Sequence, residues 1–293
     1  MKRIAIAAGL AAAAATLSMS AASPVRDPID TLVYQASTAQ PGVTYTGLVQ
    51  SVAFNDNDPD AVVYRIEHRP PNITERIYLS PERLKGDEVL VRGAEGYFVD
   101  AKRHRVVETE NDAVLDPVDR DDDYALIRLN YRASAHADES FDGRHVKVVA
   151  LVNRYTATTT MIMRIDDSTK LVLDRQEYAP DGTILSETRF QEVRYVPSLP
   201  DSDFQVPSSY ATVRGPQFGA STKDVGSLAS KSGFGARVPR SLPEGFSAIE
   251  GHIAKVRTAP TVHVLYSDGI RTVSIFENAG SSNAPRPSAT PTR

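Results

Sequence analysis

The chain has 293 residues, 41% of them hydrophobic and 24% charged, which is enough to form one large domain or two unequal ones. Its formal net charge is −4 and Lys and Arg are not clustered, which argues against binding to nucleic acid or to an anionic membrane surface. The absence of cysteine excludes disulfides, a thiol nucleophile and lipid attachment to a cysteine.

Residues 1–22 have the organisation of a secretory signal peptide. Lys2 and Arg3 form a positive start, an Ala-rich apolar run extends from Ile4 to Leu17, and small residues follow. The apolar run is shorter than the roughly 20 residues that a membrane span needs. We expect cleavage near Ala22 and export of the mature protein. A buried N-terminal helix is the less favoured alternative.

Residues 25–210 are predicted to form the larger domain, beginning with a short helix over residues 27–40. Pro28 suits the first turn of this helix, and apolar residues recur at helical spacing until Pro41-Gly42. From Val43 onward the apolar period changes to two, which is typical of strands with one apolar face. Strands are expected over residues 43–54, 61–69, 73–80, 87–92, 96–101 and 105–110.

A second helix is expected over residues 119–132, because acidic residues crowd its start, where the helix dipole favours them. Residues 142–195 then contain four runs rich in Val, Ile, Tyr, Thr and Leu. Sharp turns separate these runs, including one at Ala179-Pro180-Asp181-Gly182. Together these features predict a mainly β (α+β) fold, a strongly curved antiparallel sheet around a helical plug.

The C-terminal part is predicted to contain a second, smaller domain. Residues 211–238 are rich in Gly, Ser and Lys and are interpreted as a linker. Residues 239–278 are expected to form a small β domain with strands over 248–257, 262–266 and 270–276. Residues 279–293 have a Pro, Ser and Ala composition that cannot form a core, so we expect a disordered tail.

A curved sheet has a concave apolar face, and a face that the helices do not fill would form a groove the size of a lipid. A face completely filled by side chains is an equally plausible alternative. Strand alternation alone selects the residues expected to line the groove, and a shift of one residue would reverse each assignment. They are Tyr64, Ile66, Ile77, Leu79, Tyr97, Val99, Met161 and Met163.

The motifs of common enzymes and metal sites are absent. The chain has no GxSxG, SxxK or Gly-rich phosphate loop, and none of its six histidines pairs with another at metal-ligand spacing. The loop at residues 55–60 resembles a calcium loop superficially but lacks the Gly and the closing Glu that such a loop needs. We therefore expect no catalytic residues, no metal and no cofactor, and interpret the protein as a binding or regulatory module.

Two stretches resemble the MucB/RseB family of periplasmic sigma-E regulators. The first lies within residues 142–195 and matches at Gly143, Arg144, Val146, Val149, Asp166, Ser168, Lys170, Leu171, Asp181, Gly182, Ile184 and Phe190. The second, Leu242-Pro243-Glu244-Gly245-Phe246 followed by Leu265-Tyr266-Ser267-Asp268-Gly269 and Val273-Ser274, resembles the start of the family's small C-terminal domain. The two stretches occur in the family's order, on either side of the predicted linker.

The resemblance implies a half-barrel similar to the carriers LolA and LolB, whose concave face accepts lipid, lipopolysaccharide or lipoprotein acyl chains. It also implies a periplasmic location and a small domain that helps to hold the periplasmic part of a membrane-anchored anti-sigma factor, shielding it from proteolysis. For the partner surface we select Tyr266, Asp268 and Arg271. For Asp268, a simple role in a turn is an equal alternative.

The chain departs from the family after Phe276, where the family's second domain continues and this sequence becomes low in complexity. This departure puts the anti-sigma contact in question and leaves a homodimer possible. The alternative function is a periplasmic carrier of lipid or lipoprotein of the LolA/LolB type, without an anti-sigma partner.

Overall fold

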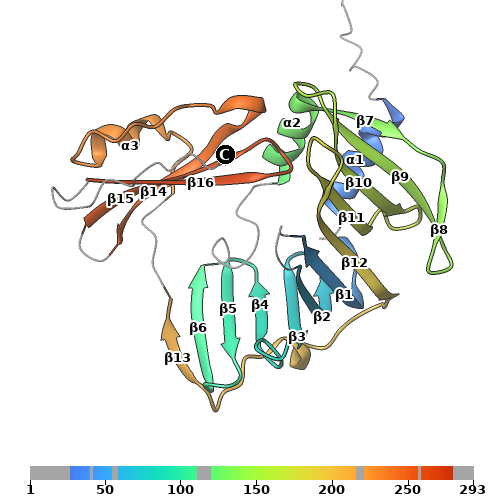
Figure 1. Cartoon of the computed structure of the whole chain (residues 1–293). Helices are drawn as coiled ribbons and strands as arrows, with labels where there is room; N and C mark the ends of the chain where they lie inside the picture. The colour runs from blue at the N-terminus through green and yellow to red at the C-terminus, as the bar shows by residue number, and fades with distance from the viewer. Residues whose placement is uncertain are drawn as a thin grey trace, which may run out of the picture.

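The computed structural model describes residues 27–39, 42–54, 59–110, 120–215, 221–256 and 259–279. The predicted signal peptide, the loop at 55–58 and the tail from residue 280 onward lie outside the described residues. Within them, the chain forms a 13-stranded sheet and a separate three-stranded sheet (Figure 1). This architecture confirms the predicted mainly β fold with a small C-terminal β domain.

The first half of the large domain follows the predicted elements to within two residues. Helix α1 spans Pro28–Ala39 and is followed by six strands. Their bounds are β1 Tyr45–Ala53, β2 Asp60–Arg69, β3 Ile73–Ser80, β4 Glu88–Arg92, β5 Glu95–Asp100 and β6 Arg105–Glu110.

The second half begins with helix α2, Arg120–Asn130, and ends with the predicted meander. The helix ends two residues earlier than expected because Tyr131 and Arg132 pair with Asn153 and Val152 in a strand that alternation did not predict. The strands of this half are β7 Tyr131–Ala135, β8 Glu139–Phe141, β9 Arg144–Asn153, β10 Thr159–Asp166, β11 Val172–Tyr178 and β12 Ile184–Tyr195.

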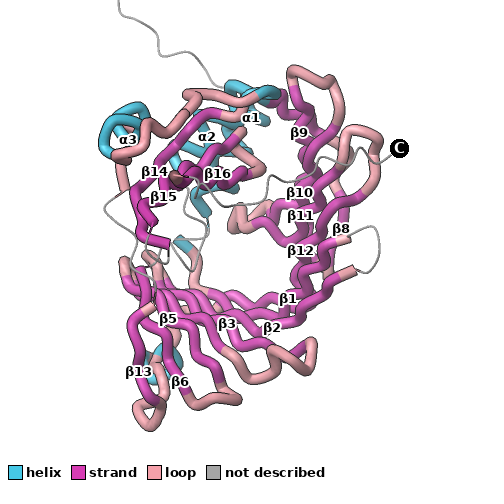
Figure 2. Tube along the Cα trace, turned by 60° about the vertical axis from the view of Figure 1, so that its left-hand side comes forward, coloured by secondary structure: helices cyan, strands magenta, loops and turns pink. Residues whose placement is uncertain are grey.

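Strand β1 joins the two halves, because it pairs with β2 on one side and with β12 on the other. The order across the sheet is β13-β6-β5-β4-β3-β2-β1-β12-β11-β10-β9-β7, with β8 also paired to β9. The sheet turns through a broad arc, with α1 and α2 inside it near β9 and β10 (Figure 2). We call the face that carries the helices the inner face and the opposite one the outer face.

Residues 196–210, here called the strap, lead from β12 across the outer face to β13, Ala211–Arg214, which pairs in parallel with β6. The strap contains the 3-10 helix η3, Asp201–Phe204. Phe204 is only 1% exposed and packs against Leu90 and Val106 of the outer face. Arg69 holds the strap in place by donating hydrogen bonds to Leu199 O (3.1 Å) and to Asp201 (2.6 Å).

The small domain is a three-stranded sheet covered on one face by a helix from the segment predicted to be a linker. The strands are β14 Ser247–Val256, β15 Ala259–Ser267 and β16 Thr272–Asn278, preceded by the 3-10 helix η4, Pro243–Gly245. Helix α3, Gly226–Lys231, buries Leu228 against Val262 and Val264. This corrects the linker prediction, because a few apolar side chains without a clear period are enough to attach a short helix to a sheet.

Candidate ligand-binding face and domain joint

Two methionines of β10 lie on the inner face, beneath the helical plug. Met161 pairs with Leu151 and Met163 with Val149 of β9, and all four side chains are buried. Helix α1 contributes Val33 and Ala36 to the same cluster, and α2 contributes Tyr124. The Tyr124 hydroxyl donates to the backbone oxygen of Asp30 (3.1 Å), which ties the two helices together. The plug therefore covers the methionine pair with apolar and aromatic groups.

Tyr64 and Ile66 of β2 lie on the same inner face, further around the arc. Directly paired residues in a sheet share a face, and a continuous row of pairs connects Met163 through Arg175, Thr188 and Ser51 to Val62. Tyr64 is two residues beyond Val62 and therefore has the same orientation. Burial raises the pKa of Tyr64, although the nearby Arg76 guanidinium opposes this effect.

A glycine creates the space in which this part of the inner face packs. A Cβ on Gly47 would lie 2.7 Å from the Phe190 ring and 2.8 Å from the backbone oxygen of Glu192. Phe190 therefore occupies the position of a side chain, and its ring meets that of Tyr45 edge-on at 5.7 Å. Tyr64, Ile66 and Val49 belong to the same buried cluster. The inner face at β1 and β2 is thus filled by side chains.

The other four predicted groove residues lie on the outer face. Arg65 follows Tyr64 and points the opposite way, and the row Arg65–Ile77–Glu88–Val99 runs across β2 to β5. Tyr97 and Val99 are buried in the cluster that Phe204 of the strap completes. The eight residues therefore do not line one surface: Tyr64, Ile66, Met161 and Met163 share the inner face, and Ile77, Leu79, Tyr97 and Val99 do not.

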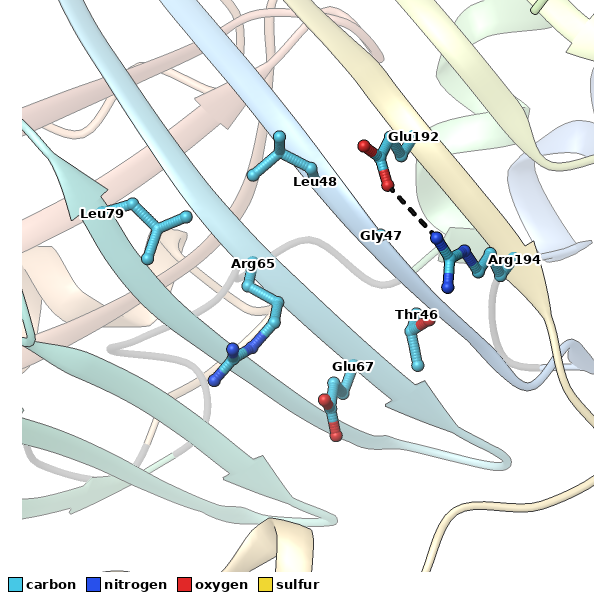
Figure 3. A pocket seen from close by; sticks show the side chains of 8 residues that line it. All are labelled: Thr46, Gly47, Leu48, Arg65, Glu67, Leu79, Glu192 and Arg194. Atoms are coloured by element: carbon cyan, nitrogen blue, oxygen red, sulfur yellow. Dashed lines mark ion pairs between the residues drawn. The ribbon is translucent and has the colours of Figure 1, made fainter.

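Leu79 borders a solvent-open hollow of about 330 Å³ on the outer face, shown in Figure 3. Leu48 of β1 lies between Arg65 of β2 and Glu192 of β12 in the same row. The lining of the hollow combines apolar and oppositely charged side chains. The lining residues are Thr46, Gly47, Leu48, Arg65, Glu67, Leu79, Glu192 and Arg194.

Three glutamates gather on the outer face beside the strap. Glu67 pairs directly with Glu75, and Glu88 lies on the neighbouring strand. Burial, together with the charges of Glu88 and Glu67, raises the pKa of Glu75 to about 7, although Arg65 opposes the shift. Burial also raises the pKa values of Glu67 and Glu88. At neutral pH this cluster carries less negative charge than three independent carboxylates would.

A buried polar network joins the small domain to the C-terminal end of α2. The side-chain amide of Asn130 donates to the backbone oxygens of Gly245 (3.0 Å) and Asp268 (2.9 Å). The hydroxyl of Tyr131 donates to the Asp268 carboxylate (2.6 Å), which also accepts from Arg271 Nε (3.1 Å). Burial and the Asp268 carboxylate raise the pKa of Tyr131. We call these residues and their contacts the domain joint.

Glycine permits the close approach at the domain joint. Gly269 has a φ of +102°, and a Cβ there would lie 2.6 Å from the backbone nitrogen of Ile127 in α2. The hairpin between β15 and β16 therefore rests on the helix backbone itself. Because Tyr124 of the same helix belongs to the plug, α2 contacts both the inner face and the small domain.

Of the three residues predicted to form a partner surface, Tyr266 and Asp268 lie inside the protein and Arg271 is partly buried. Tyr266 is fully buried and its hydroxyl donates to the backbone oxygen of Pro239 (2.7 Å). Asp268 is also fully buried, and Arg271 is paired with it at 3.0 Å. In this structure Asp268 and Arg271 serve the domain joint. The sequence could not distinguish this internal role from a partner surface, because a hairpin turn with charged residues is compatible with either role.

The residues that carry the family resemblance in the meander have structural roles. The Asp166 carboxylate accepts hydrogen bonds from the backbone of Ser168 (2.7 Å) and from the Tyr195 hydroxyl (2.7 Å). Arg144 stacks over the Tyr195 ring at 4.6 Å and donates to Val193 O (3.1 Å). Gly182 has a φ of +88°, as its turn requires. This motif therefore fixes the ends of β9, β10 and β12.

Among the described residues, no group of three or more His, Asp or Glu side chains is arranged to hold a metal ion. In the same part of the chain, no helix is long and apolar enough to cross a membrane. The arrangement offers a covered apolar face, a hollow of mixed charge and a joint between two domains.

Comparison with solved structures identifies the fold. No protein-family model matches the chain, and no curated protein matches it by sequence. The structure is similar to MucB in complex with MucA(peri), with a TM-score of 0.59, 15% identity, and coverage of 85% of this chain and 79% of that one. The Pseudomonas aeruginosa MucA/MucB complex gives 0.59 at 14% identity, covering 85% of this chain and 80% of the other. MucB alone gives 0.54 at 14% identity, covering 85% and 78%. The chain therefore has a MucB-type fold.

Proposed function

We propose that this protein is a non-enzymatic regulator of a sigma-E-type envelope stress response in the periplasm. In this proposal, it binds the periplasmic part of a membrane-anchored anti-sigma factor. An apolar ligand, such as the acyl chains of lipid, lipopolysaccharide or lipoprotein, binds at the inner face of the large sheet and weakens that complex.

The observation that carries the proposal is the extent of the structural similarity. The alignment with MucB bound to MucA(peri) covers 85% of 293 residues, which is more than the large domain contains. It must therefore include the small domain as well. A carrier that used only the half-barrel would not need the small domain or its attachment to α2.

The apolar character of the inner face is the basis for proposing acyl chains as the ligand. Tyr64, Ile66, Met161 and Met163 are all buried on this face, so a ligand must displace part of the cover to reach them. Over the methionines that cover is the helix pair, and methionine side chains adapt readily to irregular apolar partners. We propose that acyl chains enter by lifting the plug away from β9 and β10.

Helix α2 connects the proposed ligand site on the inner face with the small domain, which in this proposal helps to bind the partner. A ligand that displaces Tyr124 must shift the helix, and the same helix ends in Asn130, which is bonded to the small domain. A ligand changes affinity for a partner only through a difference between two states of the protein. In this proposal the two states differ in whether the domain joint is closed.

The test is a binding measurement between the mature protein and the purified periplasmic segment of a membrane-anchored anti-sigma factor from the same organism. Calorimetry without lipid should detect a complex, and addition of a lyso-phospholipid below its critical micelle concentration should weaken it. Absence of a complex would contradict the proposal that the protein is a regulator. A complex that is indifferent to lipid contradicts the sensing mechanism.

A second measurement separates the regulator from the carrier. Native mass spectrometry of the protein purified from the periplasm should show co-purifying lipid, and Met163→Lys should abolish it by placing a charge under the plug. If lipid binds but the anti-sigma segment does not, the protein is the carrier that the sequence left as an alternative.

A further inference from the structure

Charged side chains of alternating sign surround the hollow on the outer face. Two rows of directly paired residues cross it from β2 through β1 to β12. These rows are Arg65–Leu48–Glu192 and Glu67–Thr46–Arg194. Directly paired residues share a face of the sheet, so all six border the same surface, as Figure 3 shows. Each row ends in one basic and one acidic group, and the second row reverses the order of the first. Neighbouring corners of the hollow therefore carry opposite charges.

The two charged groups on β2 have fewer partners than the two on β12. On β12, Glu192 and Arg194 pair with each other, with 3.7 Å between Oε2 and Nη2. On β2, Arg65 interacts electrostatically with glutamates of β2, β3 and β4, but no carboxylate of the described chain forms an ion pair with it. The Oε2 atom of Glu67 is buried and accepts no hydrogen bond from any described group. Strand β2 therefore offers a guanidinium group and a carboxylate oxygen that can both take a further partner.

The same hollow has two apolar side chains beside its charged corners. Leu48 lies between Arg65 and Glu192 in its row. Leu79 of β3 is two residues beyond Ile77, which pairs with Arg65, so it lies on the same face and is 43% exposed. The volume of about 330 Å³ is at the lower end of the range for small-molecule sites. A small ligand can therefore place an apolar group on the two leucines while its charged ends meet β2.

We propose that this hollow binds a short zwitterionic peptide, namely an apolar dipeptide with a free ammonium group and a free carboxylate. The ammonium group binds Glu67, the carboxylate binds Arg65, and the apolar side chains of the peptide lie on Leu48 and Leu79. Such peptides are products of peptide-bond hydrolysis. The site lies on the face opposite the proposed lipid site and is independent of the proposed function.

The pattern of charges favours a zwitterion over a simple ion. Two guanidinium groups and two carboxylates line the hollow, so a simple anion or cation meets as many repelling groups as attracting ones. A ligand that carries both charges gains from both signs when it is correctly oriented. Complementary charge patterns of this kind determine which ligand is accepted and in which orientation.

The spacing of the two groups on β2 sets the length of the ligand. Arg65 and Glu67 are two residues apart on one strand, so their Cα atoms are separated by about 6.6 Å. An extended dipeptide spans about 7 Å at most, which matches this separation. The charged groups of a single amino acid are joined through one carbon atom and are too close together to meet both side chains as well.

The first test compares end-blocked versions of one peptide by NMR titration of the mature wild-type protein. Leucyl-leucine should bind with a Kd of about 1 mM or tighter. N-acetyl-leucyl-leucine lacks the ammonium group and leucyl-leucinamide lacks the carboxylate, so each should bind at least ~10-fold more weakly. Glycyl-glycine should also bind more weakly, because it has no side chain to place on the leucines. Absence of leucyl-leucine binding, or equal binding of the blocked peptides, overturns the proposal.

The second test assigns each end of the peptide to one side chain. Arg65→Gln should weaken leucyl-leucine binding about 10-fold but should not weaken binding of leucyl-leucinamide, which has no carboxylate to lose. Glu67→Gln should likewise weaken leucyl-leucine but not N-acetyl-leucyl-leucine. The matched control is Arg83→Gln, at an exposed arginine that does not line the hollow, and it should leave every affinity unchanged. Leucyl-leucine binding that both β2 variants leave intact would place the peptide elsewhere and overturn the proposal.

Discussion

The two faces of strand β2 differ in what covers them, although their residues alternate along one stretch of chain. Tyr64 and Ile66 point inward, to the face that carries α1 and α2, whereas Arg65 and Glu67 point outward, to the face that the strap crosses. Both faces of the sheet are buried in places. Alternation of apolar and polar residues along a strand is therefore not sufficient to identify the functional face.

The two covers also differ in what they are attached to. The strap continues directly from β12 and is held to the outer face by Arg69. The helix pair ends at Asn130, which is bonded to the small domain. The inner cover therefore has a direct hydrogen-bonded contact with the second domain, which is why we propose that the ligand binds at that face.

Removal of the strap's anchor should have the largest effect on stability. Phe204→Ala leaves a cavity beneath a ring that is 1% exposed and should cost about 3–4 kcal/mol of unfolding free energy. Denaturant unfolding measures this cost, and Phe54→Ala, at a ring that is 40% exposed, should cost less than about 1 kcal/mol. Equal losses would show that the strap is not a structural cover.

A substitution on the inner face should have the next largest effect. Gly47→Ala places a Cβ against Phe190 and the backbone oxygen of Glu192, and overpacking of this kind should cost about 2 kcal/mol. Gly42→Ala is the matched control, because no atom lies within 4 Å of its Cβ position. If both variants unfold at the same denaturant concentration, the tight packing at β1 is not present in solution.

The domain joint should contribute less, because the Asp268 carboxylate keeps other partners. Tyr131→Phe removes one buried hydrogen bond and should cost about 1–2 kcal/mol. It should also increase proteolysis between the domains. Tyr210→Phe, at a partly exposed tyrosine of the strap away from the joint, should have almost no effect on either measurement. A Tyr131→Phe variant that resists proteolysis as well as the wild type would contradict the proposal that α2 transmits the effect of the ligand through the domain joint.

The outer glutamates should give the smallest effect, and one that depends on pH. The folded-state pKa of Glu75 is about 7, above its ordinary value of 4.5. Its contribution to stability is therefore fully present below about pH 4.5 and is lost as the pH rises to about 7. Glu75→Gln should be more stable than the wild type by about 1–2 kcal/mol at about pH 8 and equal to it at about pH 4.

The matched control for this pH dependence is Glu82→Gln, at an exposed position away from the cluster. Its difference from the wild type should be the same at every pH tested. A Glu75→Gln variant with an equally flat profile would mean that Glu75 is not buried beside Glu67 and Glu88.

Most of the elements were predictable because local patterns determine them. Helix α1, strands β1 to β6 and the four strands of the meander follow from apolar period and turn residues. Strands β7, β8 and β13 were not predicted: β7 and β8 are short strands that pair with the nearby β9, and β13 pairs with the distant β6. For the candidate site, alternation correctly grouped Tyr64 with Ile66 and Met161 with Met163. It could not show whether Tyr97 lies on the same face as these pairs, because the pairing register and bulges between strands decide that, and alternation within one strand does not reveal them.

The sequence by itself determined the mainly β architecture, the curved sheet, the small C-terminal β domain and the resemblance that names the fold. These features depend on residue periods and on turns such as Asp181-Gly182, which act over a few residues. Only the tertiary structure decided which face the helices cover, that α3 belongs to the small domain, and that Asp268 is an internal partner of Tyr131. The physical reason is that burial depends on what packs against a residue from elsewhere in the chain, and no local pattern records that neighbour.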